Sequence, residues 1–275
     1  MTDIAVVVLA AGAGTRMKST TPKILHTLAG RSLVGHALHG AAGLDPQHLV
    51  AVVSHERELV SAAIGEIAGQ LGVSVAIADQ PEPRGTGDAA RVGLDRLPAD
   101  FTGTVVVTAA DVPLLDADTL RAIIDAHTAD GGAAVTLTSF VADDPTGYGR
   151  IVRSPAGAAE AIVEHKDATA DQRAITEVNA GVYAFDAALL RDALAQVSTD
   201  NAQGEFYLTD VIEIARKAGR TVRAHIVDDP YLVAGCNDRA QLSDLAAELN
   251  RRIVRGHQLA GVTVVDPATT WIDVE

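Results

Sequence analysis

The sequence predicts an α/β protein in which helices flank a mostly parallel, twisted sheet. Apolar, β-branched runs alternate with helical patterns along most of the 275 residues, which is the order of repeated β–α–β units. The first run, Ile4–Leu9, leads directly into a loop that contains Gly12 and Gly14. Hydrophobic residues make up 48% of the chain, enough to bury a sizeable core. Open sheets of this class bind ligands at the carboxyl ends of their strands.

The expected elements follow in order. Strands are predicted at residues 4–9, 49–53, 73–78, 104–108, 133–140, 178–185 and 221–227. Between them, helices are predicted from a cap at Ser54 to residue 71, and at 86–97, 118–127 and 205–218. Residues 149–154 and 158–165 flank Pro155-Ala156-Gly157 and predict a β-hairpin inserted in the series.

The C-terminal part predicts an amphipathic helix, because residues 238–257 keep their apolar side chains on one side. The run at 262–265, beyond Gly261, has a β-like pattern and resembles the beginning of another domain. We therefore divide the chain into a main domain at 1–237, a linker helix at 238–260 and the start of a further domain at 261–275.

Charge and composition exclude several classes of partner. The net charge of −14 argues against binding to a nucleic-acid backbone or to an anionic membrane surface. The single cysteine, Cys236, excludes an intramolecular disulfide and a cysteine-based zinc cluster. No apolar run approaches the length of a membrane span and no basic leader is present, so we expect a cytoplasmic protein. A small polyanion remains possible as a ligand.

The loop after the first strand is a candidate phosphate site. Gly12 and Gly14 allow left-handed backbone angles, so that successive N–H groups can face one anion. Arg16 and Lys23 add positive charge near the same mouth. Met17 stands where the dinucleotide fingerprint and the Walker motif each need glycine, which disfavours both. A tight β–α turn with a solvated arginine stays open as an alternative.

Three further groups of polar residues follow apolar strands. Asp111 comes after the strand at 104–108, where a carboxylate can hold Mg²⁺, and Asn237 offers a second oxygen. An Asx turn at Asp111 and a helix cap at Asn237, with Asp238 as the ligand instead, are the alternatives. Asp116 can cap the next helix. Gln80 can present a donor and an acceptor to a base edge, with Gly85 and Thr86 opening the next helix, although an ordinary Pro/Gly turn fits too.

These pieces together resemble the N-terminal half of the bifunctional GlmU family, the bacterial N-acetylglucosamine-1-phosphate uridylyltransferases. The segments that carry the resemblance are 9–17, 22–23, 80, 85–87, 111–114, 144–150, 163–168, 178–181, 201–205 and 235–237. The family implies a Rossmann-like domain that converts UTP and N-acetylglucosamine 1-phosphate into UDP-N-acetylglucosamine and pyrophosphate with Mg²⁺. It also implies an acetyltransferase half, a left-handed β-helix that forms homotrimers. Residues 261–275 resemble the first strands of that half, so we expect no acetyl transfer from this chain.

The resemblance assigns roles residue by residue. Arg16 and Lys23 would be catalytic, Asp111 and Asn237 would hold Mg²⁺, and Gly149, Glu164 and Asn179 would contact the sugar. The nucleotide would be bound by Leu9, Ala10, Ala11, Gly12, Gly14, Lys23, Gln80, Gly85 and Thr86, with Asn237 also touching substrate.

The chain departs from the family pattern in two places. Ala109 and Ala110 precede Asp111 where an aromatic residue or Ser and then Gly are frequent, so Ala110 needs an ordinary backbone conformation. Asp88 stands where the family commonly has His. The alternatives are another sugar-1-phosphate nucleotidyltransferase and a non-catalytic nucleotide-sugar binding protein.

Overall fold

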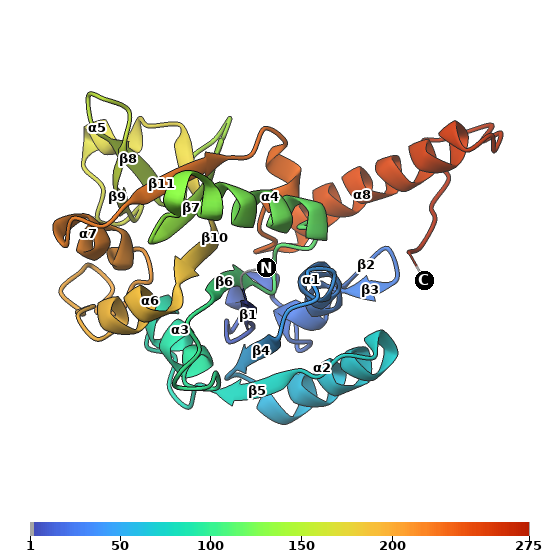
Figure 1. The fold of residues 1–275 in the computed structure, drawn as a ribbon. Helices are drawn as coiled ribbons and strands as arrows, with labels where there is room; N and C mark the ends of the chain where they lie inside the picture. Colours follow the sequence, from blue (N-terminus) through green and yellow to red (C-terminus); the bar gives the residue numbers. More distant parts are fainter. Residues whose placement is uncertain (1–2, 275) are drawn as a thin grey trace.

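The computed structural model describes residues 3–274 and confirms the predicted α/β architecture (Figure 1). A nine-stranded sheet runs through the body in the order β11-β7-β10-β6-β1-β4-β5, with β8 and β9 attached beside β10. The strands of this sheet and of the small β2–β3 ribbon are β1 Ile4–Leu9, β2 Thr27–Leu28, β3 Arg31–Ser32, β4 His48–Val53, β5 Ala76–Asp79, β6 Thr104–Ala109, β7 Val135–Val141, β8 Arg150–Arg153, β9 Ala159–Val163, β10 Glu177–Asp186 and β11 Val222–Ile226.

Helices cover both faces of the sheet. The α-helices are α1 Leu33–Ala42, α2 Arg57–Leu71, α3 Thr86–Leu94, α4 Ala117–Thr128, α5 Ala170–Arg173, α6 Ala187–Leu194, α7 Asp210–Lys217 and α8 Arg239–Leu259. One core lies between the sheet and α3, α6 and α7, and a second lies between the opposite face and α1, α2 and α4. None of the helices in residues 3–274 combines the length and apolar character that crossing a bilayer requires.

The central strands are parallel, as predicted. β1 pairs in parallel with β4 and β6, and β4 with β5, so their carboxyl ends meet at one edge. β10 is the exception, because it runs antiparallel to both β6 and β7. Its register shifts between Asn179 and Tyr183, where Gly181 has a φ of 72°. This β-bulge changes the direction of β10 next to the hairpin.

The inserted hairpin is confirmed as β8 and β9, and β8 pairs with β10 through Arg150 opposite Val178. Arg150 is almost completely buried, and its guanidinium donates to the Tyr148 carbonyl, to His165 Nδ1 at 3.3 Å and to the Arg173 carbonyl at 3.4 Å. Burial lowers the pKa of Arg150, with the nearby charge of Arg173 adding to the effect. The hairpin is therefore tied to the loop that follows it.

Two boundary predictions are corrected by the structure. Ser54 does not cap a helix, because α2 begins at Arg57 after Glu56, which has a φ of 50°. The helix predicted at 205–218 begins only at Asp210, since Phe206 and Leu208 form hydrogen bonds with Gly87 and Thr86 at the start of α3. Asp116 does cap α4, accepting from the Thr119 N–H at 2.8 Å.

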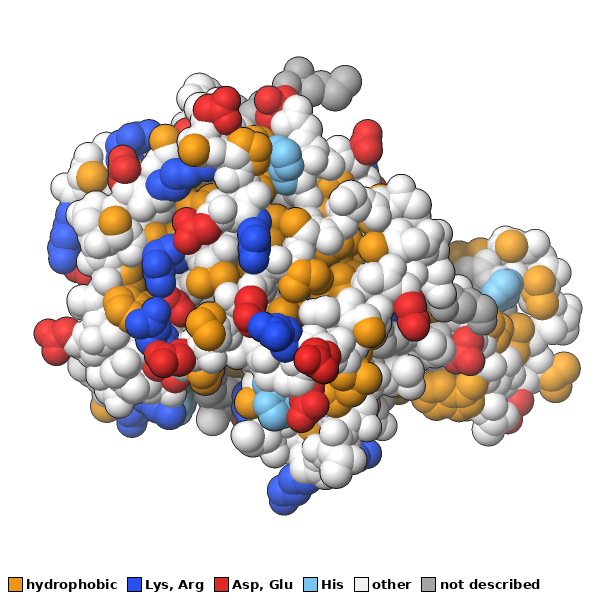
Figure 2. Space-filling view, turned by 90° about the horizontal axis from the view of Figure 1, so that it is seen from below, with side chains coloured by type: hydrophobic (Ala, Val, Ile, Leu, Met, Phe, Trp, Pro, Cys, Tyr) orange, Lys and Arg blue, Asp and Glu red, His pale blue; other side chains and the backbone are white. Residues whose placement is uncertain are grey.

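α8 projects from the rounded body (Figure 1). Figure 2 shows apolar side chains on this projecting part. On the face of the body seen in that figure, acidic and basic side chains are interspersed. The tail turns back after α8: Asn250 donates to the Thr270 carbonyl at 2.7 Å and accepts from the Ile272 N–H at 3.0 Å. Residues 261–274 contain no strand, and the proposal that they begin a further domain stays a prediction.

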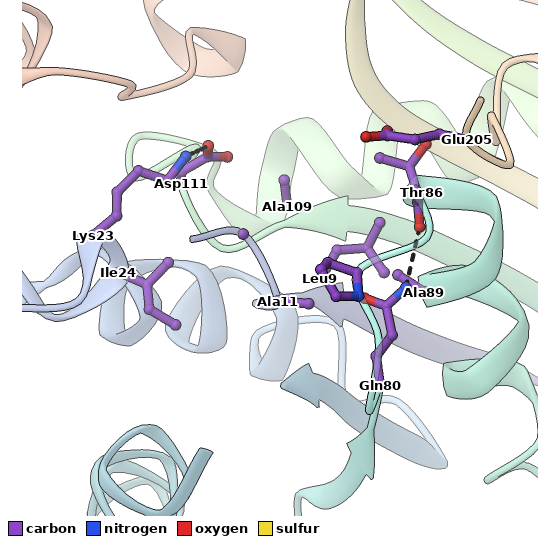
Figure 3. Close-up of a pocket in the computed structure, with 13 residues that line it drawn as sticks. Leu9, Ala11, Lys23, Ile24, Gln80, Thr86, Ala89, Ala109, Asp111 and Glu205 are labelled. Atoms are coloured by element: carbon purple, nitrogen blue, oxygen red, sulfur yellow. Dashed lines mark hydrogen bonds and ion pairs between the residues drawn. The ribbon is translucent and has the colours of Figure 1, made fainter. Parts of the chain in front are cut away.

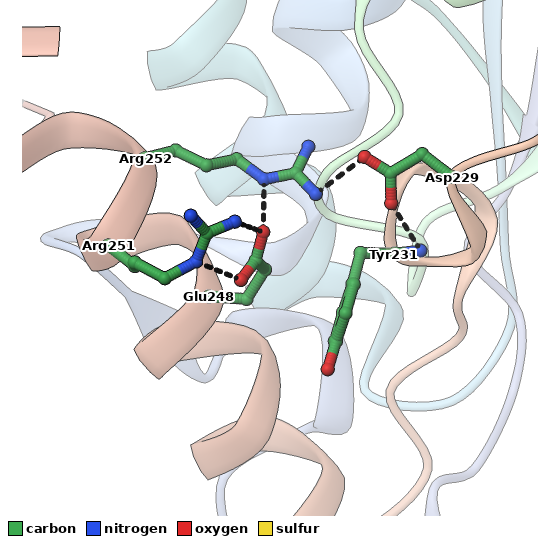
Figure 4. Close-up of polar contacts among 5 residues, drawn as sticks. All are labelled: Asp229, Tyr231, Glu248, Arg251 and Arg252. Atoms are coloured by element: carbon green, nitrogen blue, oxygen red, sulfur yellow. Dashed lines mark hydrogen bonds and ion pairs between the residues drawn. The ribbon is translucent and has the colours of Figure 1, made fainter. Parts of the chain in front are cut away.

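The middle of α8 is joined to Asp229, the N-cap of the short 3-10 helix Pro230–Val233, by an ionic network (Figure 4). Glu248, only 9% exposed, accepts from Arg251 Nε at 2.7 Å and from Arg252 Nε at 2.6 Å. Arg252 also donates to Asp229 at 2.8 Å. We call these four residues the clamp: the Glu248 contacts lie within α8, and the ion pair of Arg252 with Asp229 joins the helix to the body.

Candidate functional site

A pocket of about 280 Å³ opens at the carboxyl ends of β1, β5 and β6, beside the start of α3 (Figure 3). This is the edge at which open α/β sheets bind ligands. It is lined by Leu9, Ala11, Gly12, Lys23, Ile24, Gln80, Pro83, Gly85, Thr86, Ala89, Ala109, Asp111 and Glu205. Most of the predicted nucleotide-binding residues are thus brought together in one cavity.

The loop after β1 is shaped by Gly14, which has a φ of 61°. A Cβ at Gly14 would collide with the side chain of Lys23. Thr15–Met17 then forms a single 3-10 turn, and Met17 is buried at 1% exposure. No α-helix starts here, which accounts for the absence of the third glycine of a dinucleotide loop. The loop instead returns a side chain to the core and leaves Arg16 exposed at the rim.

Two cation–oxygen pairs lie at or near the pocket: Lys23 and Asp111 line it, whereas Arg16 and Asn237 do not. Lys23 Nζ forms an ion pair with Asp111 Oδ2. Arg16 Nη2 donates to Asn237 Oδ1 at 2.8 Å. Residues so far apart in the sequence come together because the Cys236 N–H donates to the Asp111 carbonyl at 2.7 Å. The Asp111 loop and the segment that precedes α8 therefore form one wall.

The cap of α8 is Asp238, not Asn237. Asp238 accepts from the Gln241 N–H at 2.9 Å, whereas the Asn237 N–H donates to Gln241 Oε1 at 2.8 Å. This leaves the Asn237 side chain directed to Arg16. The alternative in which Asp238 binds the metal is disfavoured, because its carboxylate already completes the first turn of α8.

The donor set at this rim fits Mg²⁺. Asp111 and Asn237 supply hard oxygen ligands, and Mg²⁺ is commonly bound by one or two such protein groups with phosphates and water completing its shell. In this structure, each of the two oxygens contacts a cation. No cluster of three or more His, Cys, Asp or Glu suited to a metal occurs in residues 3–274, so phosphate oxygens would have to supply further ligands.

The loop between β5 and α3 presents Gln80 to the pocket. Gln80 Nε2 donates to the Gly85 carbonyl at 3.3 Å and to Asp88 Oδ2 at 2.9 Å. Gly85 has a φ of 109°, and a Cβ there would lie 2.5 Å from the Phe206 carbonyl oxygen. Thr86 lines the pocket, but its hydroxyl oxygen accepts from the Leu208 N–H at 3.1 Å. Thr86 therefore also anchors the segment beside it.

The three predicted sugar contacts lie together on the hairpin side. A Cβ on Gly149 would be 3.4 Å from Glu164 Oε1 and 3.5 Å from the Asn179 Cβ. Asn179 donates to the Tyr183 hydroxyl at 2.6 Å and accepts from the Gly181 N–H at 3.1 Å. These residues do not line the 280 Å³ pocket, so they form a second cluster.

The pKa of Glu164 is raised above the ordinary value of a glutamate. Burial raises its pKa, and the neighbouring carboxylates of Asp167 and Asp210 raise it further, whereas a hydrogen bond from Thr209 opposes them. That bond joins Thr209 Oγ1 to Glu164 Oε1 at 3.2 Å. Because Leu208 is bonded to Thr86, the segment at 206–209 connects the pocket to the second cluster.

The structure places the remaining sites as follows. Ala10 is predicted to bind substrate, but its side chain is 3% exposed and packs in the core opposite the pocket. Ala110 is fully buried and has no positive φ, so this position accepts alanine in place of the glycine that is frequent in the family.

Sequence reasoning missed the lining residues Ile24, Pro83, Ala89, Ala109 and Glu205. Four of them lack polar side chains, and only their proximity to the assigned loops could have indicated them.

A glycine-containing loop at the end of a strand, two cations and two side-chain oxygens lie at or beside an open pocket, which is an arrangement suited to a phosphorylated ligand. The sequence matches the profile of the nucleotidyl transferase family over residues 5–274, and the chain belongs to that family. Among solved structures, it resembles the nucleoside-diphosphate-sugar pyrophosphorylase from Vibrio cholerae, with a TM-score of 0.70 and 20% identity over 88% of this chain and 99% of the other. At that identity, the likeness concerns the fold.

Curated relatives are closer in sequence. The chain is 65% identical over 275 residues to the bifunctional protein GlmU of Mycolicibacterium vanbaalenii and 62% identical over 275 residues to that of Mycolicibacterium gilvum. It is 61% identical over 272 residues to the GlmU of Rhodococcus opacus. These alignments cover 100%, 100% and 98% of this chain but 56%, 55% and 54% of the relatives. The chain therefore spans about half the length of the curated relatives it matches.

Proposed function

We propose that the chain transfers the uridylyl group of UTP to N-acetylglucosamine 1-phosphate, giving UDP-N-acetylglucosamine and pyrophosphate. The observation that carries the proposal is the pairing of Lys23 with Asp111 in the pocket and of Arg16 with Asn237 in the segment bonded to the Asp111 loop. The high identity to proteins named GlmU along the whole chain supports this choice of substrates.

The two clusters suit the two substrates. Gln80, Gly85 and Thr86 would bind uracil, with Leu9, Ala11 and Gly12 lining the rest of the nucleotide site. The backbone N–H groups at Gly12 and Gly14, together with Arg16 and Lys23, would hold the phosphates. Gly149, Glu164 and Asn179 would contact the sugar of the acceptor. The acceptor phosphate would then approach the nucleotide from the hairpin side.

Transfer requires no general base. The second pKa of a phosphate monoester is about 6, so the attacking oxygen is already anionic near neutral pH. The difficulty is to bring two polyanions together, and positioning with charge neutralisation overcomes it, as in phosphoryl transfer. Asp111 and Asn237 would hold a Mg²⁺ ion, which would supply additional positive charge to the phosphates. Lys23 and Arg16, released from those oxygens, would bind phosphate and the departing pyrophosphate.

Several wider expectations accompany this proposal. We infer that the complete protein forms homotrimers through its C-terminal domain and acts in the cytoplasm, without nucleic-acid or membrane partners. These points follow from the resemblance and from the charge of the chain.

The test is pyrophosphate release from a panel of nucleoside triphosphates and sugar 1-phosphates, with Mg²⁺ and with excess EDTA. We expect the highest kcat/KM for UTP with N-acetylglucosamine 1-phosphate, and loss of turnover on chelation. A better substrate pair would identify another sugar nucleotidyltransferase. Binding of UDP-N-acetylglucosamine without turnover would indicate a non-catalytic sensor, and turnover that survives full chelation would refute the magnesium role.

A further inference from the structure

Asp88 is a buried carboxylate directly behind the pocket. It lies in the first turn of α3, is 3% exposed and does not line the cavity. Its two oxygens have different partners. Oδ1 accepts from Arg91 at 2.5 Å and from Arg84 at 3.4 Å, whereas Oδ2 accepts from Gln80 Nε2 at 2.9 Å. Asp88 therefore connects surface arginines to the side chain expected to contact the base.

This arrangement fixes which end of the Gln80 amide faces the pocket. The amide nitrogen has two acceptors, Asp88 Oδ2 and the Gly85 carbonyl. Neither a carboxylate nor a carbonyl can donate, so a flipped amide would place oxygen against oxygen. In Figure 3, the Gln80 nitrogen makes the bond to Gly85 and the amide oxygen points toward Leu9 and Ala11. The group offered to a ligand is an acceptor.

Asp88 remains ionised in this position. Burial by itself would raise its pKa, but the hydrogen bonds from Gln80 and Arg91 and the charges of Arg84 and Arg91 outweigh that effect and lower it. The Oδ2 atom consequently carries no proton in the neutral range. The orientation of Gln80 is then enforced throughout the pH range in which transfer would be measured.

We propose that Asp88 is a positioning residue that sets the pyrimidine preference of the site, by holding Gln80 with its amide oxygen toward the base. This inference rests on the proposed function. Uracil has a proton on N3 and can donate to that oxygen, whereas N3 of cytosine carries a lone pair at the same place. An acceptor fixed opposite a lone pair is left unpaired in a buried site, which is costly. The pair UTP and CTP differs only at this edge.

The variant Asp88→Asn tests the inference. Asparagine has nearly the same shape but can turn its amide, so that only the longer bond to the Gly85 carbonyl, at 3.3 Å, still opposes a flipped Gln80. We expect the ratio of kcat/KM for UTP to that for CTP to fall by about tenfold or more, since a fixed donor–acceptor match is worth at least that factor. The loss should appear mainly in KM for UTP, while kcat changes little.

Arg91→Gln is the matched control. It removes one ion pair of Asp88 but leaves the Oδ2 bond to Gln80. A merely structural network would respond to both variants with a lower Tm and an unchanged substrate ratio. We expect the ratio to stay at the wild-type value in Arg91→Gln. An unchanged ratio in a folded Asp88→Asn protein overturns the inference and leaves the proposed function intact.

Two further measurements settle the remaining cases. If the wild-type chain shows no turnover, the proposed function fails, and calorimetric binding of UDP and CDP to the same variants decides the role of Asp88. If Asp88→Asn does not fold, a crystal structure of the wild-type chain with UDP decides it. Gln80 Oε1 at N3 of uracil, with Nε2 still on Asp88, supports the inference, and any other base contact refutes it.

Discussion

Arg16 is exposed, yet it is held by a single directed contact to Asn237 at 2.8 Å. We expect Arg16→Ala to lower kcat by on the order of 10²-fold or more, the range seen when one preorganised electrostatic group is removed. Steady-state pyrophosphate release measures this. Lys18→Asn is the control, because it removes a nearby charge and asparagine tolerates the φ of 48° at that position. Near-wild-type turnover of Arg16→Ala would exclude Arg16 from the mechanism.

Glu164 makes the stability of the chain depend on pH. Its pKa is raised by burial, so its protonated form is favoured in the folded state. The stability associated with that form is complete below the unfolded pKa of about 4.3 and is lost as the pH rises through the folded value. Gln has the shape of the protonated acid and still accepts from Thr209.

We therefore expect Glu164→Gln to have a higher Tm than the wild type at pH 7 to 8. The rise should be roughly 2–4 °C for each kcal/mol recovered in a chain of this size. The two proteins should converge near pH 4. Thermal unfolding across this range provides the measurement, and a variant less stable than the wild type at pH 8 would contradict the burial argument.

The turn between β5 and α3 depends on one glycine. Gly85 combines a φ of 109° with close contact to the backbone of Phe206, so a Cβ meets both strain and collision. We expect Gly85→Ala to lower stability by about 1–3 kcal/mol and to impair uridine nucleotide binding, because the turn also carries Gln80. Denaturant unfolding and UDP calorimetry measure the two effects.

Gly157→Ala separates strain from collision. Gly157 has a φ of 84° in the β8–β9 turn, with nothing within 4 Å of an added Cβ. This variant should show only the smaller conformational cost and bind UDP normally. Equal losses in the two variants would mean that the contact with Phe206 is unimportant for the shape of the turn.

These elements also show how far the sequence could lead. Gln80 and Asp111 were predicted as site residues because each follows a recognisable strand, and a parallel sheet brings strand ends to one edge. The direction of β10 could not be predicted, since strand polarity depends on the whole path of the chain. Nor could the late start of α7, because Phe206 and Leu208 contact the start of α3, which local helix periodicity does not reveal.

Asn237 illustrates a similar limit. Its place before α8 suggested a cap, yet the structure gives that role to Asp238. The contact of Asn237 with Arg16 depends on a backbone bond between Cys236 and Asp111, which joins two distant parts of the chain. That Asp111 and Asn237 could lie at one sheet edge was predicted from the residues, but the bonds that join them were not.

At the scale of the whole molecule, the clamp neutralises Glu248 within α8 and reaches the body through Arg252 and Asp229 (Figure 4). Its residues do not line the pocket. Hydrogen bonds from Arg251 lower the pKa of Glu248 most strongly. Hydrogen bonds from Arg252 and the charges of both arginines lower it further, while partial burial opposes them. Its contribution to stability is therefore present above the unfolded pKa and is lost as the pH falls through the lower folded value. Glu248→Gln keeps the shape of the side chain but removes its charge.

We expect Glu248→Gln to lower the free energy of unfolding by about 1.5–3 kcal/mol at pH 7, the worth of a hydrogen bond to a charged group. The deficit should shrink as the pH is lowered through the acid range. Turnover at 25 °C should remain near the wild-type value, because the residue does not line the pocket. Glu213→Gln, which removes an exposed ion pair with Lys217, should change stability by less than about 0.5 kcal/mol. If the two variants were equally stable, the clamp would be no stronger than a surface ion pair; a fall in kcat would instead mean that α8 transmits its position to Asn237 and the pocket.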